Sequence, residues 1–312
     1  MLPFFKIAIG TWAWGNRLIW DYGIDFEEKD LESLVKTAIS DGSRYFFTSE
    51  SFSDGFGEVL LGRLTAPYGN AFLATKYVPR VWRFGRKEFD AALRRSLARL
   101  GRDSIDLYLL ERPTGWMGLD LMAECAAEGV EAGRIRNVGV ANFRAEELEP
   151  FRERLAQYGV ALTAVAGEYN LLNRESERNG ALAYCRAQNI PFLAESPLAM
   201  GLLTGKYIYD APANGVRRSL AERFRFDRLD LLIHLLNAIG SEYQGMDCGQ
   251  VALNWISAKG AIPVAGAKTS AQEEHNRLSF GFTLSEDQIE HIQEFARSEE
   301  HTSELQSLVD IS

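Results

Sequence analysis

The chain has only three cysteines and four histidines, and it has no excess of positive charge. Cys125, Cys185 and Cys248 show no spacing typical of a disulfide framework or a metal site, which suits a reducing compartment. The 34 lysines and arginines stand against 43 aspartates and glutamates, a formal net charge of −9. Such a balance offers no basic stripe for a phosphate backbone. We therefore expect neither a metal nor a nucleic-acid partner.

Long apolar segments are also missing. No run of 18 apolar residues occurs, and the N-terminal MLPFFKIAIG lacks the charged, apolar and small-residue regions of a signal peptide. We expect a cytoplasmic protein that has no membrane partner. The sequence predicts no protein partner either, so the expected partner is a small-molecule ligand or substrate.

The C-terminal segment is unlike the rest of the chain. Residues 297–307 read RSEEHTSELQS, which resembles the translation of a common sequencing adapter. We interpret residues 297–312 as an artefactual or disordered tail, and His301 is left out of the search for a site. The remaining residues, 1–296, are expected to form one domain.

Eight short apolar runs alternate with longer amphipathic stretches, the pattern of repeated β-α units. Helical spacing is clear in EKDLESLVKTAISDG, which ends at Gly42, and in KEFDAALRRSLARLG, which ends at Gly101. A doubly wound sheet is the alternative, but GTWAWG after the first run has neither the GxGxxG spacing nor a following helix. The predicted fold is an α/β (β/α)8 TIM barrel, with its chemistry where the strands end. The runs are KIAIGT, RYFFTS, AFLATK, IDLYLLE, IRNVGVAN, LTAVAGEY, PFLAESP and AIPVAGAK.

Several long motifs carry a family resemblance. RRSLARLGRDSIDLYLLERP, GRIRNVGVANF, EYNLLNR, SPLAMGLLTGKY, QVALNWI and IPVAGAK resemble the aldo-keto reductases over residues 7–290. GTWAWG and ERNG are most similar to the bacterial and plastid branch that includes pyridoxal reductases. The resemblance implies carbonyl reduction with NADPH by an Asp, a Tyr, a Lys and a His. The tyrosine donates a proton, the lysine lowers its pKa, the aspartate pairs with the lysine, and the histidine orients the carbonyl.

Three of these four catalytic positions are substituted. The segment YFFTSESF places Phe47 at the aspartate position and Phe52 at the tyrosine position. Lys76 matches the family lysine, but Glu111 in LLERP stands at the histidine position. Phenylalanine has no exchangeable proton, so the resemblance implies a loss of ordinary reductase chemistry.

The two ends of the expected cofactor site differ. At the nicotinamide end Asn142 matches the family asparagine, but Ala141 and Ala166 replace hydrogen-bonding residues, and Glu195 stands where a tyrosine stacks on the ring. The resemblance therefore implies NADP(H) binding that is weakened or lost. At the far end Lys268 would favour NADPH over NADH, although His275 replaces a family glutamate. The positions that match in this half are Ser196, Leu198, Gly201, Lys268, Thr269, Gln272 and Asn276.

Three functions remain open from the sequence. The preferred one is a degenerate or repurposed barrel that binds NADP(H) or a small ligand without family reductase activity. The second is a residual NADPH-dependent aldehyde or ketone reductase whose proton comes from water or Glu111. The third is a non-redox lyase or isomerase that uses Lys76 with Glu111 and Glu195.

Lys76 itself allows two interpretations. Glu111 ends a neighbouring strand and can simply be its new counterion. Alternatively Lys76 is a base or nucleophile with a lowered pKa. Most of five tryptophans are expected on loops around the site: Trp12, Trp14, Trp20, Trp82 and Trp116.

Overall fold

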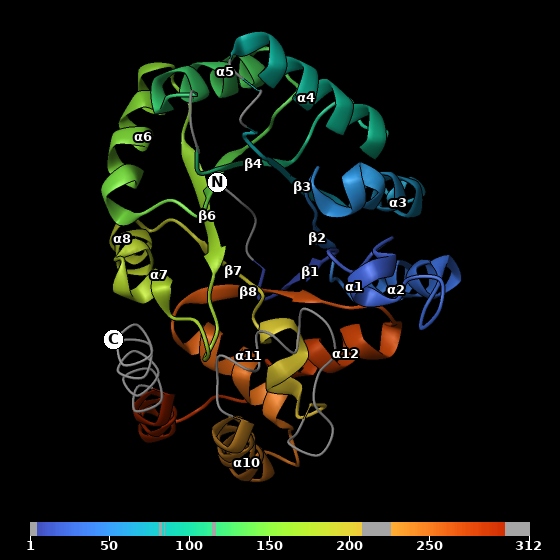
Figure 1. Cartoon of the computed structure of the whole chain (residues 1–312), viewed down its shortest axis with the longest axis vertical. Coiled ribbons are helices and arrows are strands. Elements are labelled where there is room, and N and C mark those ends of the chain that lie inside the picture. The colour runs from blue at the N-terminus through green and yellow to red at the C-terminus, as the bar shows by residue number, and fades with distance from the viewer. Residues whose placement is uncertain (1–4, 81–82, 84, 114–116, 208–225, 297–312) are drawn as a thin grey trace, which may run out of the picture.

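Eight parallel strands close into a barrel in chain order, with β8 hydrogen-bonded to β1 (Figure 1). The computed structural model describes residues 5–80, 83, 85–113, 117–207 and 226–296. The predicted (β/α)8 barrel is confirmed. The predicted tail, residues 297–312, lies outside the described residues, so its nature and the domain boundary at residue 296 stay predictions.

Seven strands fall inside their apolar runs, and β3 extends one residue beyond AFLATK, to Tyr77. The outer helices ring the strands in Figure 1, as the alternating pattern predicts. The strands are β1 (Ala8–Gly10), β2 (Tyr45–Phe47), β3 (Phe72–Tyr77), β4 (Leu107–Glu111), β5 (Val138–Ala141), β6 (Leu162–Glu168), β7 (Phe192–Glu195) and β8 (Ala261–Gly266).

Glycines in the left-handed conformation follow two of the outer helices. The helices α2 and α4 are followed by Gly42 at φ 88° and Gly101 at φ 62°, a left-handed conformation that glycine adopts without steric cost. The helices are α1 (Arg17–Trp20), α2 (Glu28–Ser40), α3 (Phe56–Thr65), α4 (Arg86–Leu100), α5 (Leu119–Glu131), α6 (Ala145–Gln157), α7 (Glu175–Arg178), α8 (Ala181–Gln188), α10 (Phe226–Ser241), α11 (Cys248–Ala258), α12 (Ser270–Leu278) and a helix over residues 286–296, with short 3-10 helices η1 (Phe52–Gly55) and η2 (Ala199–Thr204).

Side chains alternate between the inside of the barrel and the layer under the helices, because successive strand residues point to opposite faces. On β3, Ala74 belongs to the apolar cluster of the barrel interior, and Leu73 belongs to the larger core between strands and helices. The same alternation places Lys76 inward, two residues after Ala74. At the carboxyl ends of the strands, the interior apolar cluster therefore gives way to charged residues.

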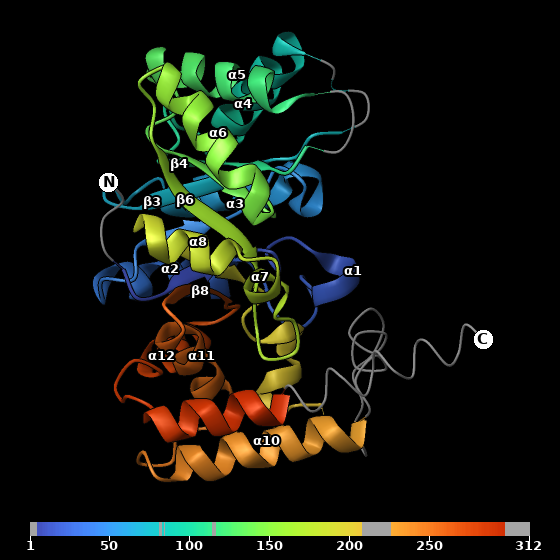
Figure 2. The same cartoon turned by 90° about the vertical axis from the view of Figure 1, so that its left-hand side faces the viewer.

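The last helices pack together at one end of the molecule. Figure 2 shows α10 beside the helix over residues 286–296, and Tyr243 Oη donates to Gln288 Oε1 at 2.6 Å. None of the helices described is long and apolar enough to span a membrane.

Candidate active site at the barrel mouth

Lys76, Glu111 and Glu195 meet at the carboxyl ends of their strands. Glu111 and Glu195 are the last residues of β4 and β7, and Lys76 is the last residue but one of β3. The carboxyl ends of parallel strands lie at the same face of a barrel, so residues far apart in the chain come close together there. The structure thus brings together all three residues that the non-redox hypothesis named.

The Lys76 ammonium group is neutralised by two carboxylates. Its Nζ atom lies 2.9 Å from Glu195 Oε2 and 3.7 Å from Glu111 Oε2, and its side chain is 11% exposed. Burial disfavours the charged form, but Glu195 and Glu111 outweigh it, so the pKa of Lys76 is raised. The hypothesis of a lowered pKa is therefore wrong. A lysine that stays protonated is a poor base and a poor nucleophile.

Glu195 is the nearer partner, which sequence reasoning did not identify. The sequence predicts Glu111 as the counterion, and Glu111 lies within ion-pair distance of Lys76. However, Lys76 Nζ donates its hydrogen bond to Glu195. The lysine is therefore tied to the residue at the expected nicotinamide-stacking position.

Glu111 is held from two sides. Asn142, the residue after β5, donates from Nδ2 to Glu111 Oε1, and Lys76 approaches Oε2. Burial nevertheless prevails, and the pKa of Glu111 is raised; Lys76 and Asn142 oppose that shift, and the negative charge of Glu195 adds to it. Glu111 is therefore easier to protonate than an ordinary glutamate.

The two phenylalanines occupy different environments. Phe47 points into the barrel and packs in the interior apolar cluster, where it is 4% exposed. Phe52 lies on the rim, with its ring centroid 5.9 Å from Lys76 Nζ and 6.2 Å from that of Trp12. Neither side chain carries a proton that could be donated. Lys76 is thus bordered by the Phe52 ring and by the two carboxylates.

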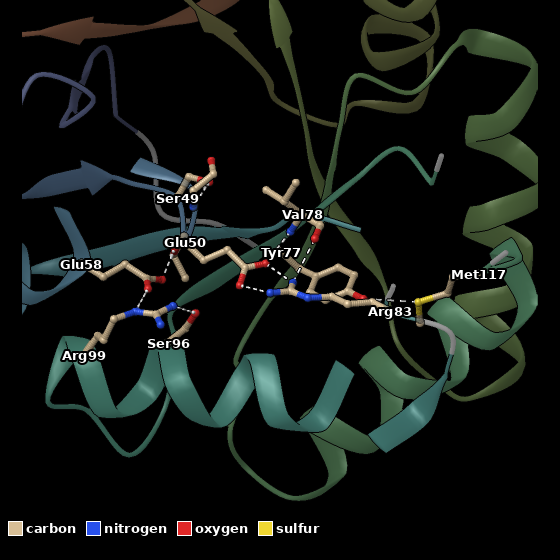
Figure 3. A network of polar contacts seen from close by, with 11 residues as sticks. Ser49, Glu50, Glu58, Tyr77, Val78, Arg83, Ser96, Arg99 and Met117 are labelled. Carbon is tan, nitrogen blue, oxygen red and sulfur yellow. Dashed lines mark hydrogen bonds and ion pairs between the residues drawn. The ribbon is translucent and has the colours of Figure 1, made fainter. Parts of the chain in front are cut away.

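A buried ion pair fixes the loop that follows β3. Glu50 binds Arg83 through both guanidinium NH groups, one at 2.9 Å, and accepts from Val78 N at 2.7 Å (Figure 3). The side chains of Glu50 and Arg83 are 3% and 9% exposed. Two parallel hydrogen bonds make such an arginine–carboxylate pair stronger than a single bond and also fix its orientation. The sequence carries no signal for this pair, whose members lie 33 residues apart in the chain.

The residues matched to the far end of the cofactor site cluster in two loops. Thr269 caps α12 by accepting from Gln272 N at 3.3 Å, and Asn276 Nδ2 donates to Gly266 O at 3.2 Å. Ser196, Leu198 and Gly201 lie after β7, where the backbone turns through left-handed residues at Ser196 (φ 50°) and Gly201 (φ 95°). Turns of this kind can aim backbone N–H groups at an anion.

Lys268 is engaged by the segment after β1. Its Nζ donates to Trp20 O at 3.0 Å and lies over the rings of Trp20 and Phe26. Of the five tryptophans expected around the site, Trp12 and Trp20 are partly exposed at the rim. Trp14 is fully buried and donates to Ala267 O at 2.9 Å, so the rim prediction is wrong for it. Trp82 and Trp116 lie outside the described residues.

Two further features bear on ligands. Among the residues described, no group of three or more His, Cys, Asp and Glu could hold a metal ion. A cavity of about 340 Å³ lies between η2, α10 and the start of α11. It contains none of the predicted site residues, and its lining consists of Thr204, Gly205, Asp230, Ile233, His234, Asn237, Asp247 and Cys248.

Comparison with known proteins identifies similar sequences and folds. The family model described as "Aldo/keto reductase family" matches residues 6–297. The chloroplastic pyridoxal reductase of Arabidopsis thaliana is 31% identical, over 97% of this chain and 86% of that protein. Aldo-keto reductase YhdN of Bacillus subtilis is 29% identical, over 91% and 87%. The crystal structure of a thermostable aldo-keto reductase, Tm1743, has a TM-score of 0.73 at 25% identity and covers 94% of this chain and 95% of that one.

Proposed function

This chain belongs to the aldo/keto reductase family, and we propose that it is a member that has lost ordinary carbonyl reduction. In this proposal the barrel binds NADP(H), weakly, or another small ligand. The observation that carries the proposal is the pairing of Lys76 with Glu195 at 2.9 Å. In the family, this lysine lowers the pKa of a tyrosine hydroxyl. In this chain Lys76 neutralises the Glu195 carboxylate instead.

The residues around Lys76 support the proposal. Phe52 stands at the proton-donor position and Phe47 at the position of the lysine's aspartate. General acid catalysis contributes roughly 10²- to 10⁴-fold to a rate. Its loss alone is expected to reduce carbonyl reduction to about 1% or less of that of an intact family member.

The residues fit NADP(H) at one end only. Lys268, Thr269 and Gln272 gather at the start of α12, where a cation and backbone N–H groups suit the 2'-phosphate. At the other end the Glu195 carboxylate, bound to Lys76, replaces the flat ring on which nicotinamide would stack. We therefore propose a site that retains the nucleotide end of the cofactor and has lost the nicotinamide end.

The direct test is an NADPH oxidation assay with pyridoxal and a panel of aldehydes. The chloroplastic pyridoxal reductase of Arabidopsis serves as the positive control. We expect the full chain to turn over at no more than about 1% of that rate. Turnover comparable to the control would contradict the proposal, and so would an NADPH dissociation constant below about 10 μM, a binding free energy stronger than about −7 kcal/mol.

A restored variant sharpens the test. Phe47→Asp, Phe52→Tyr, Glu111→His and Glu195→Tyr together return all four substituted positions around Lys76 to the family residues. We expect this variant, once circular dichroism shows that it is folded, to exceed the wild type by at least about 100-fold. A matched control that lacks only Phe52→Tyr should remain inactive, because it has no proton donor.

One observation favours a second candidate. The raised pKa of Glu111 makes it a better proton donor than an ordinary glutamate. The alternative is a residual NADPH-dependent aldehyde or ketone reductase with Glu111 as the acid. In that case wild-type turnover would be measurable and would fall as pH rises through the pKa of Glu111. Glu111→Gln would abolish it, whereas activity that survives this substitution would exclude Glu111.

A further inference from the structure

The segment between β1 and α2 folds over the end of β8. Strands β1 and β8 are neighbours in the closed barrel, so the loops that follow them start side by side. Two hydrogen bonds then join these loops: Trp14 Nε1 donates to Ala267 O at 2.9 Å, and Lys268 Nζ donates to Trp20 O at 3.0 Å. The consecutive residues Ala267 and Lys268 therefore contact an ordered segment that follows β1.

Trp20 and Phe26 form an aromatic box around the Lys268 ammonium group. Nζ lies 5.2 Å from the Trp20 ring centroid and 4.8 Å from that of Phe26. Both distances are within the range in which a ring face attracts a cation. Phe26 is 3% exposed, and Trp20 also packs edge-on against Trp12 with centroids 5.6 Å apart. Both rings are held in place by their own packing.

The box is held together by contacts that do not involve Lys268. Asn16 caps α1 by accepting from Ile19 N at 2.9 Å, and Asn16 O accepts from Tyr22 N at 3.1 Å. Gly23 N donates to Phe26 O at 2.7 Å. These bonds order residues 16–26, so the carbonyl and ring faces are presented together to the lysine.

We propose that residues 17–26 bind the Lys268 ammonium group as an internal ligand and so compete with the 2'-phosphate of NADP(H). This inference rests on the proposed nucleotide end of the site. A lysine ammonium is a compact charge on a flexible stem, and it cannot face the box and a phosphate at the same time. NADH lacks the 2'-phosphate, so its binding does not require Lys268 to leave. The box thus sets the preference between the two nucleotides.

Only the side chain of Lys268 has to move. Its backbone N donates to Gln272 Oε1 at 2.8 Å, and the next residue, Thr269, caps α12. A rotation of the lysine stem would bring Nζ toward the start of α12 and leave the loop backbone unchanged. Removing the Trp20 ring should therefore release the ammonium group while the phosphate-binding backbone stays as it is.

The experiment uses calorimetry to compare nucleotide binding by the full chain and four variants, which are Trp20→Ala, Leu18→Ala, Lys268→Met and the double variant Lys268→Met with Trp20→Ala. We expect Trp20→Ala to tighten NADPH binding at least threefold and to leave NADH unchanged. Leu18→Ala is the matched control, because Leu18 lies on the same helix and its side chain is 97% exposed. In a Lys268→Met background, Trp20→Ala should no longer affect NADPH.

The possible failures can be told apart. Unchanged NADPH affinity in Trp20→Ala would overturn the competition and leave the proposed nucleotide site intact. Equal weakening of NADPH and NADH would mean that Trp20 contacts the nucleotide directly, which also overturns the competition. If no variant binds NADPH, the proposed nucleotide site itself is wrong.

Chemical labelling tests the capture of Lys268 without a nucleotide. Reductive methylation followed by mass spectrometry gives the labelling rate of Lys268 relative to that of the exposed Lys36. We expect Trp20→Ala to raise this ratio at least threefold, and Leu18→Ala to leave it unchanged. An equal ratio in wild type and Trp20→Ala would overturn the capture.

Discussion

Glu111 and Glu195 both face Lys76, yet their replacement by glutamine should have different effects on stability. Their side chains are similarly exposed, 22% and 23%, so the comparison is matched. At an effective dielectric constant of about 20, unit charges at 2.9 Å attract by about 6 kcal/mol and at 3.7 Å by about 4.5 kcal/mol, before the cost of burial. Only Glu195 adds the direct hydrogen bond from Lys76, worth about 1.5–3 kcal/mol.

Burial decides whether the ionised Glu111 carboxylate stabilises or destabilises the folded chain. Its pKa is raised because burial costs the carboxylate more than Lys76 and Asn142 return. A neutral glutamine at position 111 removes that cost, and its Oε1 can still accept from Asn142 Nδ2. We therefore expect Glu195→Gln to lower the free energy of unfolding by about 2–3 kcal/mol. Glu111→Gln should change it by less than about 1 kcal/mol.

The assay is urea denaturation at pH 7, followed by fluorescence and repeated in 0.5 M salt. Salt should alter the Glu195→Gln effect little, because buried pairs are weakly screened. Glu168→Gln is the control, since Glu168 is exposed at the end of β6 and lies in register with Glu195. It should shift stability by no more than about 0.5 kcal/mol. Equal losses for positions 111 and 195, or the reverse order, would refute this account of the site.

Three further predictions concern stability. The folded-state pKa of Glu111 is raised, so the stability that its protonation contributes is fully present below its unfolded pKa of about 4.3 and is lost as pH rises through the folded value. Wild type should therefore gain stability relative to Glu111→Gln as pH falls from 7 to 4.5 in parallel urea titrations. A stability difference that does not change with pH would contradict the shift. Glu50→Gln should cost about 3–5 kcal/mol in the same assay, because it leaves the buried Arg83 without its anion, and a loss below about 1 kcal/mol would show that the pair does not fix the loop. Gly62→Ala should lower the melting temperature by several degrees, because its Cβ would lie 2.4 Å from Leu100 O, whereas Gly69→Ala, with open space around it, should not.

The fold could be predicted because its signal is local and repeated. Each strand is a short apolar run such as AFLATK, and each outer helix shows helical spacing, so the eightfold pattern is readable without any long-range contact. The ends of α2 and α4 were also predictable, because Gly42 and Gly101 both take the left-handed conformation that follows many helices. Closure of the barrel then follows from the number of strands.

The site was only partly predictable, because its contacts are set by side-chain reach across the barrel. Strand ends located Lys76, Glu111 and Glu195 at one face, but no pattern could show that Glu195, 119 residues from Lys76, is the nearer anion. Similarly, Trp14 was expected at the rim from its position after a strand. It is buried because the chain folds back and gives its indole a partner at Ala267.

The inward packing of Phe47 also constrains how this site could have evolved and how it could revert. Phe47 lies in the interior apolar cluster, and Lys76 already has two carboxylate neighbours. An aspartate restored at position 47 on its own would add a further carboxylate in an apolar layer that stabilises no charge. A return to the family residues is therefore expected to begin at Glu195 or Glu111. The order in which these positions are changed, and not only their number, should therefore decide whether a restored variant folds.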